Sequence, residues 1–598
     1  MQHICHSHNY WRNREFLYEG SGSMLKTRTI KQQLFITLLS GTAIFWASAA
    51  TAQSSSGVDI PGSADVGQTE TAIPTPDFGQ VTTPQINIPE VRVDGAPDGA
   101  ESITFVLNSI NLEGVTAYDV AELQQIWADR LGTTIALTDV YAIAQQITRK
   151  YRGDGFIITQ AIVPQQTIDG GNVTIRVVEG YIDNVSLQDA GEGFDAQRIL
   201  QLAGNLTEQN PLTAEGLERW LLLVNDIAGL EARSIISPSQ TAVGGADLLI
   251  IPTFDPYNVS VNVDNYGSRF LGPTQVSVAG QLNNFFGAAE RIEMQFVTDP
   301  DDDERMFTSL RYSMPVNSYG TVFGTDFSYS DTDPGFELAQ FDVRGYSKVF
   351  GLDLTHPIIR SRTQNLFSTL RFDYRDLIST NVVDDFKTQD TISALRLGMD
   401  YSVFDTIWRP AVTEASFTLS QGIDAFNASQ IDDATTTRTG GDPQFTKLQA
   451  NLSRLQTLNS EFSVLTSLTG QWANNPLLSS EEFGVGGRAF GRGYDASELV
   501  GDDGFGASLE LRWNPNDENT IIEDYEVFGF YDFGQVWNQE TDNDVIEDRS
   551  LASVGLGLRT DFTENVNGEF IFAYPLTKEV DAYDSADSKF LFSIGANF

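Results

Sequence analysis

The segment EFGVGGRAFGRGYDASELVGDDGFGASLELRW, residues 482–513, joins a glycine-rich polar loop to an alternating run of apolar and polar side chains. The loop contains the triplet Arg492-Gly493-Tyr494, and a later alternating run contains Phe530-Tyr531-Asp532-Phe533-Gly534. Because successive side chains of a strand point to opposite faces, Phe530, Asp532 and Gly534 share one face. A strand with one aromatic face and one face that holds a lone carboxylate is typical of a membrane β-barrel, which is apolar toward lipid and polar toward its lumen.

A carboxylate inside a barrel needs a partner, because an isolated buried charge is costly. The loop before the strand offers Arg492, and a guanidinium forms bidentate pairs with carboxylates. We therefore expect residues 474–504 to fold into the barrel and to be tethered there by an ion pair between Arg492 and Asp532. Gly493 and the glycines before it allow this loop to turn back tightly.

Alternating runs of the same kind extend from Tyr257 to the last residue, separated by turns rich in Asp, Asn, Gly and Pro. We count about sixteen of them, and closed bacterial barrels have an even number of strands. A sheet that spans lipid has to close, because every backbone polar group there needs a partner. The sequence thus predicts a membrane all-β fold, a transmembrane β-barrel of about 16 strands over residues 257–598. Alternation alone leaves a soluble β-sandwich open.

Two shorter segments before the barrel, residues 102–180 and 181–254, share one order of elements: strand, helix, helix, strand, strand. Val173, Ile175 and Val177 of the first alternate with polar residues, as in a half-buried strand. The second has an apolar stripe at Leu217, Trp220, Leu221 and Val224, which is the spacing of one helix face. We therefore predict two small α+β domains that arose as an internal repeat.

The N-terminal hundred residues divide into three parts. Residues 24–52 have the form of a secretory signal, with basic residues, an apolar run and a small-residue cleavage site at Ala50-Thr51-Ala52. An uncleaved membrane anchor is the alternative, since the apolar run is near the lower length limit of a spanning helix. Residues 1–23, which precede Met24, are expected to be a non-native extension. Residues 53–100, rich in Pro, Ser, Gly and Thr, are expected to form a disordered or partly extended linker.

Composition excludes several classes of function. The net charge of −44 argues against binding nucleic acid and against docking on anionic lipid through charge. Cys5 is the single cysteine, so an intrachain disulfide and a Cys-based metal site are excluded. We find no phosphate-binding loop, nucleophile elbow or zinc-protease motif, and the glycines at 484 and 486 lack the βαβ context of a dinucleotide site. No cofactor and no enzyme activity are expected.

The motifs and their order resemble the TpsB transporters of two-partner secretion, the haemolysin activation/secretion type of the BamA superfamily. The resemblance covers about residues 102–598, and it implies that the two α+β domains are periplasmic POTRA domains. The first carries a series of motifs that is fairly specific to this family: Tyr151-Arg152-Gly153-Asp154-Gly155-Phe156, Ala161-Ile162-Val163-Pro164-Gln165, Gly170-Gly171 and Val178-Glu179-Gly180. The terminal Phe598 resembles the targeting signal of outer-membrane barrels.

The family also has a loop motif Val-Arg-Gly-Tyr/Phe and a barrel-wall motif Phe-x-Asp-x-Gly. Phe530, Asp532 and Gly534 match the wall motif in full. A literal Val-Arg-Gly-Tyr occurs at 343–346, early in the barrel and inside an alternating run. We assign the loop motif to 492–494, with Gly at position 491 where the family has Val, because this triplet lies late and precedes Gly-Asp and a strand. Many relatives have a helix that plugs the pore, but residues 53–100 show no convincing amphipathic stripe.

The resemblance implies an outer-membrane pore in a Gram-negative bacterium that recognises an unfolded TpsA-like exoprotein and exports it without nucleotide hydrolysis. Outer-membrane lipid and the barrel assembly machinery would be further partners, and a monomer is expected. The first POTRA domain would capture an extended substrate by strand addition. The candidate capture site is an exposed strand expected over 156–163 together with the groove of the module's first helix. Its candidate residues are Phe156, Ile158, Gln160, Ile162, Pro164 and Gln165. The alternative for this strand is a purely structural edge, blunted by its proline. Alternatives for the whole chain are a factor that inserts other barrels and a passive porin.

Overall fold

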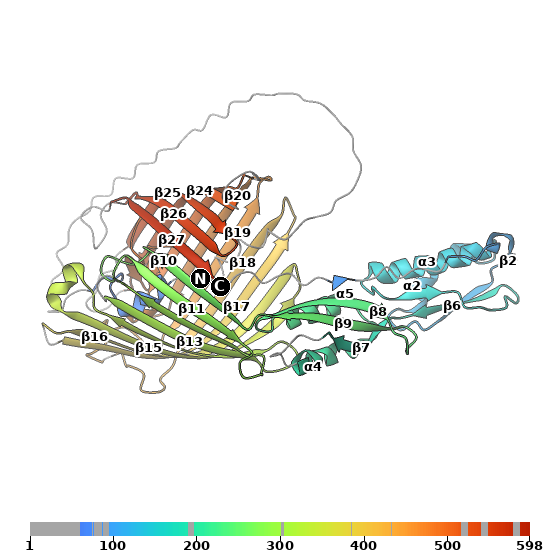
Figure 1. Ribbon diagram of the computed structural model, residues 1–598, viewed down its shortest axis with the longest axis horizontal. Coiled ribbons are helices and arrows are strands. Elements are labelled where there is room, and N and C mark those ends of the chain that lie inside the picture. Colours follow the sequence, from blue (N-terminus) through green and yellow to red (C-terminus); the bar gives the residue numbers. More distant parts are fainter. Residues whose placement is uncertain are drawn as a thin grey trace, which may run out of the picture. The chain divides into compact units, whose positions relative to one another are not determined.

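The computed structural model describes residues 60–73, 76, 86–87, 95–188, 196–300, 304–383, 386–431, 433–515, 524–539, 548–577 and 587–598 (Figure 1). The expected N-terminal extension and the secretory signal lie outside the described residues. Within them, no helix combines the length and the apolar character that crossing a bilayer requires.

The first α+β module packs two helices on a three-stranded sheet of order β3-β6-β5. Its elements are β2 (Thr104–Val106), β3 (Ser109–Glu113), α2 (Val120–Gln124), β4 (Thr134–Ala136), α3 (Leu137–Gly153), β5 (Gln160–Ile162) and β6 (Asn172–Val178). The core lies between α3, which buries Val140, Ile143 and Ile147, and the inward side chains of β6. The strand that we expected over 156–163 is wrong at its start, because residues 156–159 form turns and only β5 is extended.

The second module repeats this arrangement with β7 (Tyr181–Leu187), α4 (Ala196–Thr207), α5 (Ala214–Asn225), β8 (Leu230–Pro238) and β9 (Gly245–Phe254). Helix α5 begins after Thr213, whose hydroxyl accepts a hydrogen bond from the Gly216 amide at 3.0 Å. The apolar stripe predicted on this helix is buried in the module's core. Strand β1 (Ile86–Asn87) pairs in parallel with β8, so a part of the expected linker belongs to this sheet.

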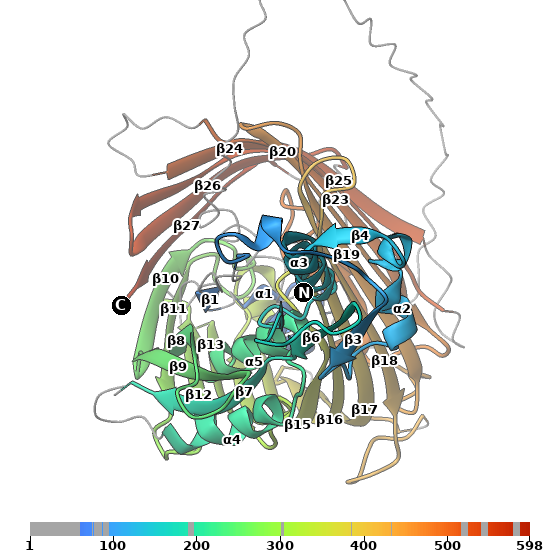
Figure 2. The same ribbon diagram turned by 90° about the vertical axis from the view of Figure 1, so that its right-hand side faces the viewer.

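Sixteen antiparallel strands close into a barrel, which confirms the predicted fold class (Figure 2). They are β10 (Tyr257–Asp264), β11 (Gln275–Asn283), β12 (Arg291–Thr298), β13 (Arg305–Pro315), β14 (Val322–Thr332), β15 (Val343–Arg360), β16 (Gln364–Asn381), β17 (Phe386–Asp405), β18 (Ala411–Gly422), β19 (Thr446–Thr457), β20 (Phe462–Ala473), β23 (Asp503–Trp513), β24 (Asp524–Trp537), β25 (Asp548–Thr563), β26 (Val566–Pro575) and β27 (Lys589–Asn597). Strand β10 closes the ring by pairing residues 260–264 with residues 597–593 of β27. Phe598 adds two backbone hydrogen bonds to Val259 beyond that ladder.

The two faces of the barrel wall differ as expected for a barrel in lipid. Side chains such as Leu509, Leu511 and Tyr531 are exposed on the outside, whereas Glu510 and Asp532, one position along, are buried on the inside. Successive hairpins alternate between the two ends of a barrel, so the connection after β20, the eleventh strand, starts at the end opposite to Tyr257. This connection, residues 474–502, is called the inner loop below.

The inner loop consists of a 3-10 turn, η6 (Ser479–Glu481), and a small hairpin of β21 (Phe483–Val485) with β22 (Leu499–Gly501). Its side chains contact inward-facing residues of β17, β19, β23 and β24, so the loop lies in the lumen. Residues 60–73, with η2 (Val66–Gln68) and α1 (Thr69–Ala72), contact the same loop. The expectation of an unstructured linker is therefore wrong for this segment, which has no amphipathic helix but is ordered by these contacts.

Candidate functional site

Arg492 at the tip of the inner loop forms a bidentate ion pair with Asp532 on β24. The Nε and Nη2 atoms of Arg492 donate to the two carboxylate oxygens of Asp532 at 2.9 and 2.8 Å. Both residues are shielded from solvent, with Arg492 4% and Asp532 0% exposed. The loop backbone contributes as well, since the amides of Gly491 and Arg492 donate to the same carboxylate at 3.3 and 3.1 Å. One wall carboxylate thus accepts four hydrogen bonds from the loop.

Two glycines make this approach of the loop possible. Gly486 and Gly491 have φ angles of 112° and 100°, a backbone region that side chains with a Cβ atom rarely adopt. The amide of Gly486 donates to the Phe490 carbonyl, which closes the turn that presents Arg492. The glycine-rich composition of the segment is therefore needed for the tight return of the chain.

The other two residues of the wall motif also contact the inner loop. The ring of Phe530 lies under the Arg492 guanidinium, with 3.5 Å between the guanidinium carbon and the ring centroid. At Gly534 a Cβ atom would lie 2.8 Å from the Cβ of Val485, so the absence of a side chain lets β21 rest on the wall. Phe530, Asp532 and Gly534 are spaced two apart because each faces the lumen.

The remaining residues of the predicted loop triplet bind the wall at β25 and β26. The Gly493 amide donates to Ser553 at 3.3 Å, and a Cβ atom at Gly493 would lie 3.0 Å from that of Ser553. The Tyr494 hydroxyl lies 2.9 and 2.7 Å from the carbonyl oxygens of Ala552 and Thr577. The structure therefore brings all six predicted residues, Arg492, Gly493, Tyr494, Phe530, Asp532 and Gly534, into one site.

A set of charged residues that was not predicted from the sequence surrounds this pair. Glu510 accepts from Arg492 at 2.8 Å, and it also pairs with Arg559 and Arg512 at 2.8 and 2.7 Å. Arg559 continues the network to Glu526 at 3.0 Å and Glu569 at 2.7 Å. Each ion has an opposite charge beside it, as buried ions require. A signal was present, because Glu510 and Arg512 occupy the inward positions of an otherwise apolar run.

The literal Val-Arg-Gly-Tyr at 343–346 has a different setting. Its residues begin β15, and the side chain of Arg344 is 49% exposed. Arg344 pairs with Asp342 at 3.2 Å and Asp333 at 3.8 Å, both on the neighbouring loop. Arg344 thus makes its two ion pairs at the surface, and neither of them reaches the inner loop.

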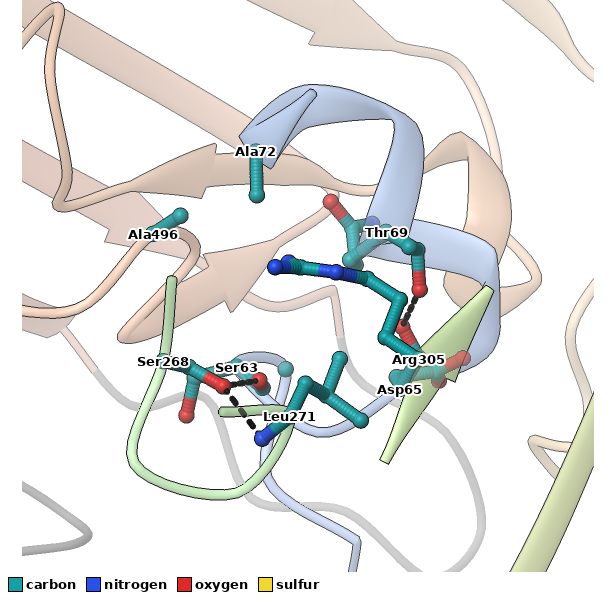
Figure 3. Close-up of a pocket in the computed structure, with 10 residues that line it drawn as sticks. Ser63, Asp65, Thr69, Ala72, Ser268, Leu271, Arg305 and Ala496 are labelled. Atoms are coloured by element: carbon teal, nitrogen blue, oxygen red, sulfur yellow. Dashed lines mark hydrogen bonds between the residues drawn. The ribbon is translucent and has the colours of Figure 1, made fainter. Parts of the chain in front are cut away.

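Residues 60–73 are fastened to the inner loop through Gln68. Its amide group donates to the carbonyls of Ser479 and Glu482 at 2.6 and 3.4 Å, and its amide oxygen accepts from Ser497 at 3.1 Å. Gln68 therefore bridges the two ends of the loop. Figure 3 shows the small cavity beneath this segment, about 10 Å³ in volume, into which the side chain of Arg305 extends.

The predicted capture residues of the first module fall into two groups. Phe156 packs on Tyr151 and Tyr118, and Ile158 packs against the core of the second module. Gln160, Ile162, Pro164 and Gln165 lie on or after β5, one of the two edge strands of the sheet. The edge is partly satisfied, since the Ala161 amide donates to the Thr148 hydroxyl of α3 at 2.9 Å.

A cleft of about 310 Å³ lies between α3 and β5. Tyr141, Ala144 and Gln145 line it from the helix, residues 161–163 line it from the strand, and Gly95 and Pro97 lie on its border. Of the predicted capture residues, Ile162 is the one that lines this cleft. We expected a groove beside the first helix, but the cleft lies beside α3, because its position depends on how this helix lies against the strand.

The chain matches the family model described as haemolysin secretion/activation protein ShlB/FhaC/HecB over residues 251–560, and the model of the ShlB-type POTRA domain over residues 105–180. The heme/hemopexin transporter protein HuxB of Haemophilus influenzae (strain 86-028NP) is 25% identical over 488 residues, which are 80% of this chain and 84% of that protein. The outer membrane transporter CdiB of Escherichia coli is 24% identical over 496 residues, 80% of each chain.

Solved structures show the same architecture. CdiB from Escherichia coli has a TM-score of 0.68 at 20% identity, and the match covers 84% of this chain and 92% of that one. BamA from Haemophilus ducreyi lacking POTRA domains 1-3 has a TM-score of 0.51 at 15% identity, covering 83% of this chain and all of the other. At these identities the likeness concerns the fold.

Proposed function

Because the chain belongs to the haemolysin secretion/activation protein family ShlB/FhaC/HecB, transporters of two-partner secretion, we propose that it exports one unfolded exoprotein through its barrel under the control of the inner loop. The family and the fold place it in the outer membrane, with its POTRA domains in the periplasm. The cargo is a TpsA-like exoprotein, and its export uses no nucleotide and no catalytic step. We assign residues 181–254 to a second POTRA domain.

The observation that carries the proposal is the Arg492–Asp532 pair. It fastens the inner loop in the conduit through which the cargo has to pass. We propose that the loop forms part of the conduit and that export requires it to stay bound at this place on the wall. Breaking one side of a buried, hydrogen-bonded ion pair costs about 3–5 kcal/mol, because the other charge is left without its partner. That is enough to free the tip of the loop from the wall, while ion pairs elsewhere, such as that of Glu481 with Lys447, still hold other parts of it.

The test is Arg492→Ala. We expect the barrel to insert in the outer membrane at the normal level, because its strands keep their ladders, and secretion of the exoprotein to fall to background. Insertion is measured by the heat-dependent shift of the folded barrel on electrophoresis, and secretion by the exoprotein in the culture medium. Arg344→Ala is the matched control, since it removes the arginine of the literal motif and leaves the inner loop untouched. Normal export by Arg492→Ala would refute the role of the pair.

We further propose that the cleft between α3 and β5 receives an extended segment of the cargo. Strand addition to β5 uses main-chain hydrogen bonds, which place little demand on the cargo's sequence. The Ala161 amide already donates to the Thr148 hydroxyl. The cargo would therefore either replace that hydroxyl as the acceptor or lie along the cleft over Ile162. The remaining predicted residues of this surface are Gln160, Pro164 and Gln165. Contacts with outer-membrane lipid, delivery by the barrel assembly machinery through Phe598, and a monomeric state belong to the same proposal.

A further inference from the structure

Glu481, at the point where the inner loop enters the lumen, lies in a cluster of three cations. Its carboxylate is 2.6 Å from Lys447 Nζ and 2.6 Å from an Arg396 nitrogen, and Arg375 is 3.9 Å away. Glu481 is 2% exposed, so these charges interact with little screening by water. The wall strands β16, β17 and β19 supply one cation each.

The backbone of Glu481 is fixed to the same part of the wall. Its carbonyl oxygen accepts from Lys447 Nζ at 2.9 Å and from the Gln471 side chain on β20 at 3.0 Å. The side chain and the main chain of one loop residue therefore contact four wall strands, β16, β17, β19 and β20. A residue that acted only as a counter-ion for wall cations would not need the second set of contacts.

The cluster at Glu481 has the opposite polarity to the site at Arg492. At Arg492 a loop cation binds wall carboxylates on β23 and β24, whereas at Glu481 a loop carboxylate binds wall cations on β16, β17 and β19. A loop that was displaced toward the wrong part of the wall would bring like charges together, which is destabilising in a poorly screened site. Opposite polarity thus specifies one orientation of the loop.

We propose that Glu481 is a second positioning residue of the inner loop, which fixes the stem of the loop as Arg492 fixes its tip. The two anchors are separate in the wall, since no ion pair among the described residues joins the two clusters. Arg396 keeps a partner without Glu481, because it also binds Asp373 at 2.6 Å. Lys447 makes its ion pair and its hydrogen bond with Glu481, through the carboxylate and the carbonyl oxygen respectively. The relevance of this anchor to export rests on the proposed function, but its effect on the loop does not.

The experiment measures how readily the loop stem reacts with a reagent from outside. Ser480, next to Glu481, is changed to Cys in a Cys5→Ser background, and intact cells are treated with a small, charged, membrane-impermeant methanethiosulfonate reagent. We expect Glu481→Gln to raise the labelling rate at least tenfold over the parent, because the neutral amide no longer holds Lys447 and Arg396. Glu481→Asp, which keeps the charge, is expected to stay within threefold of the parent.

Three comparisons make the result decisive. Arg311→Gln is the matched control, because the ion pairs that Arg311 makes among the described residues join it to Asp326 and Asp353 of the wall and not to the loop. Lys447→Met removes the basic partner instead of the acid, so it is expected to accelerate labelling as Glu481→Gln does. It also keeps the test possible if the Glu481→Gln variant fails to insert. Arg492→Ala is expected to accelerate labelling less than Glu481→Gln, since the stem stays anchored.

Labelling of the Glu481→Gln variant at the parental rate would overturn the proposal. Equal acceleration by Arg492→Ala and Glu481→Gln would also overturn it, because the loop would then be held as one unit and not by separate anchors. If labelling changes as expected while secretion by Glu481→Gln is normal, the anchor stands and the proposed control of export by the loop fails. The two proposals are thus distinguishable.

Discussion

Arg492 and Arg305 are both buried guanidinium groups inside the barrel, but their surroundings differ. Arg492 donates to two carboxylates and rests on an aromatic ring. Arg305 is 1% exposed, and among the described residues none of its three nitrogens has a hydrogen-bond partner. Burial without a partner is unfavourable, so the segment 60–73 that covers Arg305 has to be held by other contacts. Gln68, which donates to the inner loop, and Glu70, which accepts from Ser328 at 2.7 Å, provide them.

In the first module, Glu179 explains two of the sequence motifs at once. Its carboxylate accepts from the Tyr151 hydroxyl at 2.7 Å and from the amides of Thr116 and Ala117 at 2.8 and 2.9 Å. Tyr151 and Glu179 belong to motifs that are far apart in the sequence, and in the structure the two residues form one hydrogen-bonded unit. Burial acts to raise the pKa of Glu179, but these hydrogen bonds outweigh it and hold the pKa below its ordinary value of 4.5.

This shift predicts an acid-sensitive first module. Because the folded pKa is depressed, the interaction stabilises the module above the unfolded pKa and is lost as the pH falls through the folded pKa. We expect protection factors of the α3 amides, measured by hydrogen exchange on the full chain, to decrease below pH 4.5. Glu179→Gln should lower the protection factors already at neutral pH, because the free energy of opening should fall by about 1–2 kcal/mol. The variant should also lose the pH dependence. Protection in the variant equal to that of the parent at neutral pH would contradict this role.

At the scale of elements, the inner loop docks on the wall by placing large side chains over glycines. A Cβ atom would lie 2.0 Å from the Phe483 ring at Gly504 and 2.9 Å from the Phe490 ring at Gly506. The same holds for Val485 over Gly534, as described above. Glycines on inward positions of β23 and β24 therefore form shallow depressions that match the apolar side chains of the loop. Ion pairs fix the loop's orientation, and these contacts give it close packing.

Gly534→Val tests this packing. The new side chain would overlap Val485, so we expect β21 to be displaced from the wall at a cost of about 1–3 kcal/mol. The labelling rate of Ser480→Cys should rise severalfold, and the barrel should still insert. Gly529→Ala is the control on the same strand, because it faces outward and its nearest neighbour is Leu556 at 3.3 Å. If both variants label alike, close packing at Gly534 is not what holds β21.

The sequence predicted these elements to different extents, for physical reasons. Strands of the barrel follow from their period of two, because each has to present one face to lipid. The Arg492–Asp532 contact was predictable because the chemistry of a lone inward carboxylate demands a cation. The contacts of Glu481 and Gln68 were not predictable, because no local period marks these residues. The partners of Glu481 lie on wall strands and those of Gln68 on the inner loop, all distant in sequence. Residues 156–159 were wrongly expected to be extended, since an apolar run alone does not exclude the turns that pack Phe156 and Ile158.

At the scale of the whole molecule, the proposed function divides the work between two parts of the chain. The POTRA modules have a cleft beside an edge strand, where an extended peptide could be held through its main chain. The barrel has a lumen in which a loop is fixed by opposite charges at its stem and its tip. A passive porin would need the second part only. The two parts should therefore respond differently to substitution.

The last prediction separates capture from passage. Tyr141→Ser combined with Ile162→Ser removes apolar surface from both walls of the cleft but changes no barrel residue. We expect secretion of the exoprotein to fall at least tenfold, while the conductance of the purified protein in planar bilayers equals that of the parent. Arg492→Ala should change both quantities, because it acts in the lumen. Lys150→Gln is the control within the first module, since Lys150 pairs with Glu122 and Asp154 and does not line the cleft. Normal secretion by the double variant would show that cargo is not captured in this cleft, and it would favour strand addition elsewhere or no capture by the first module.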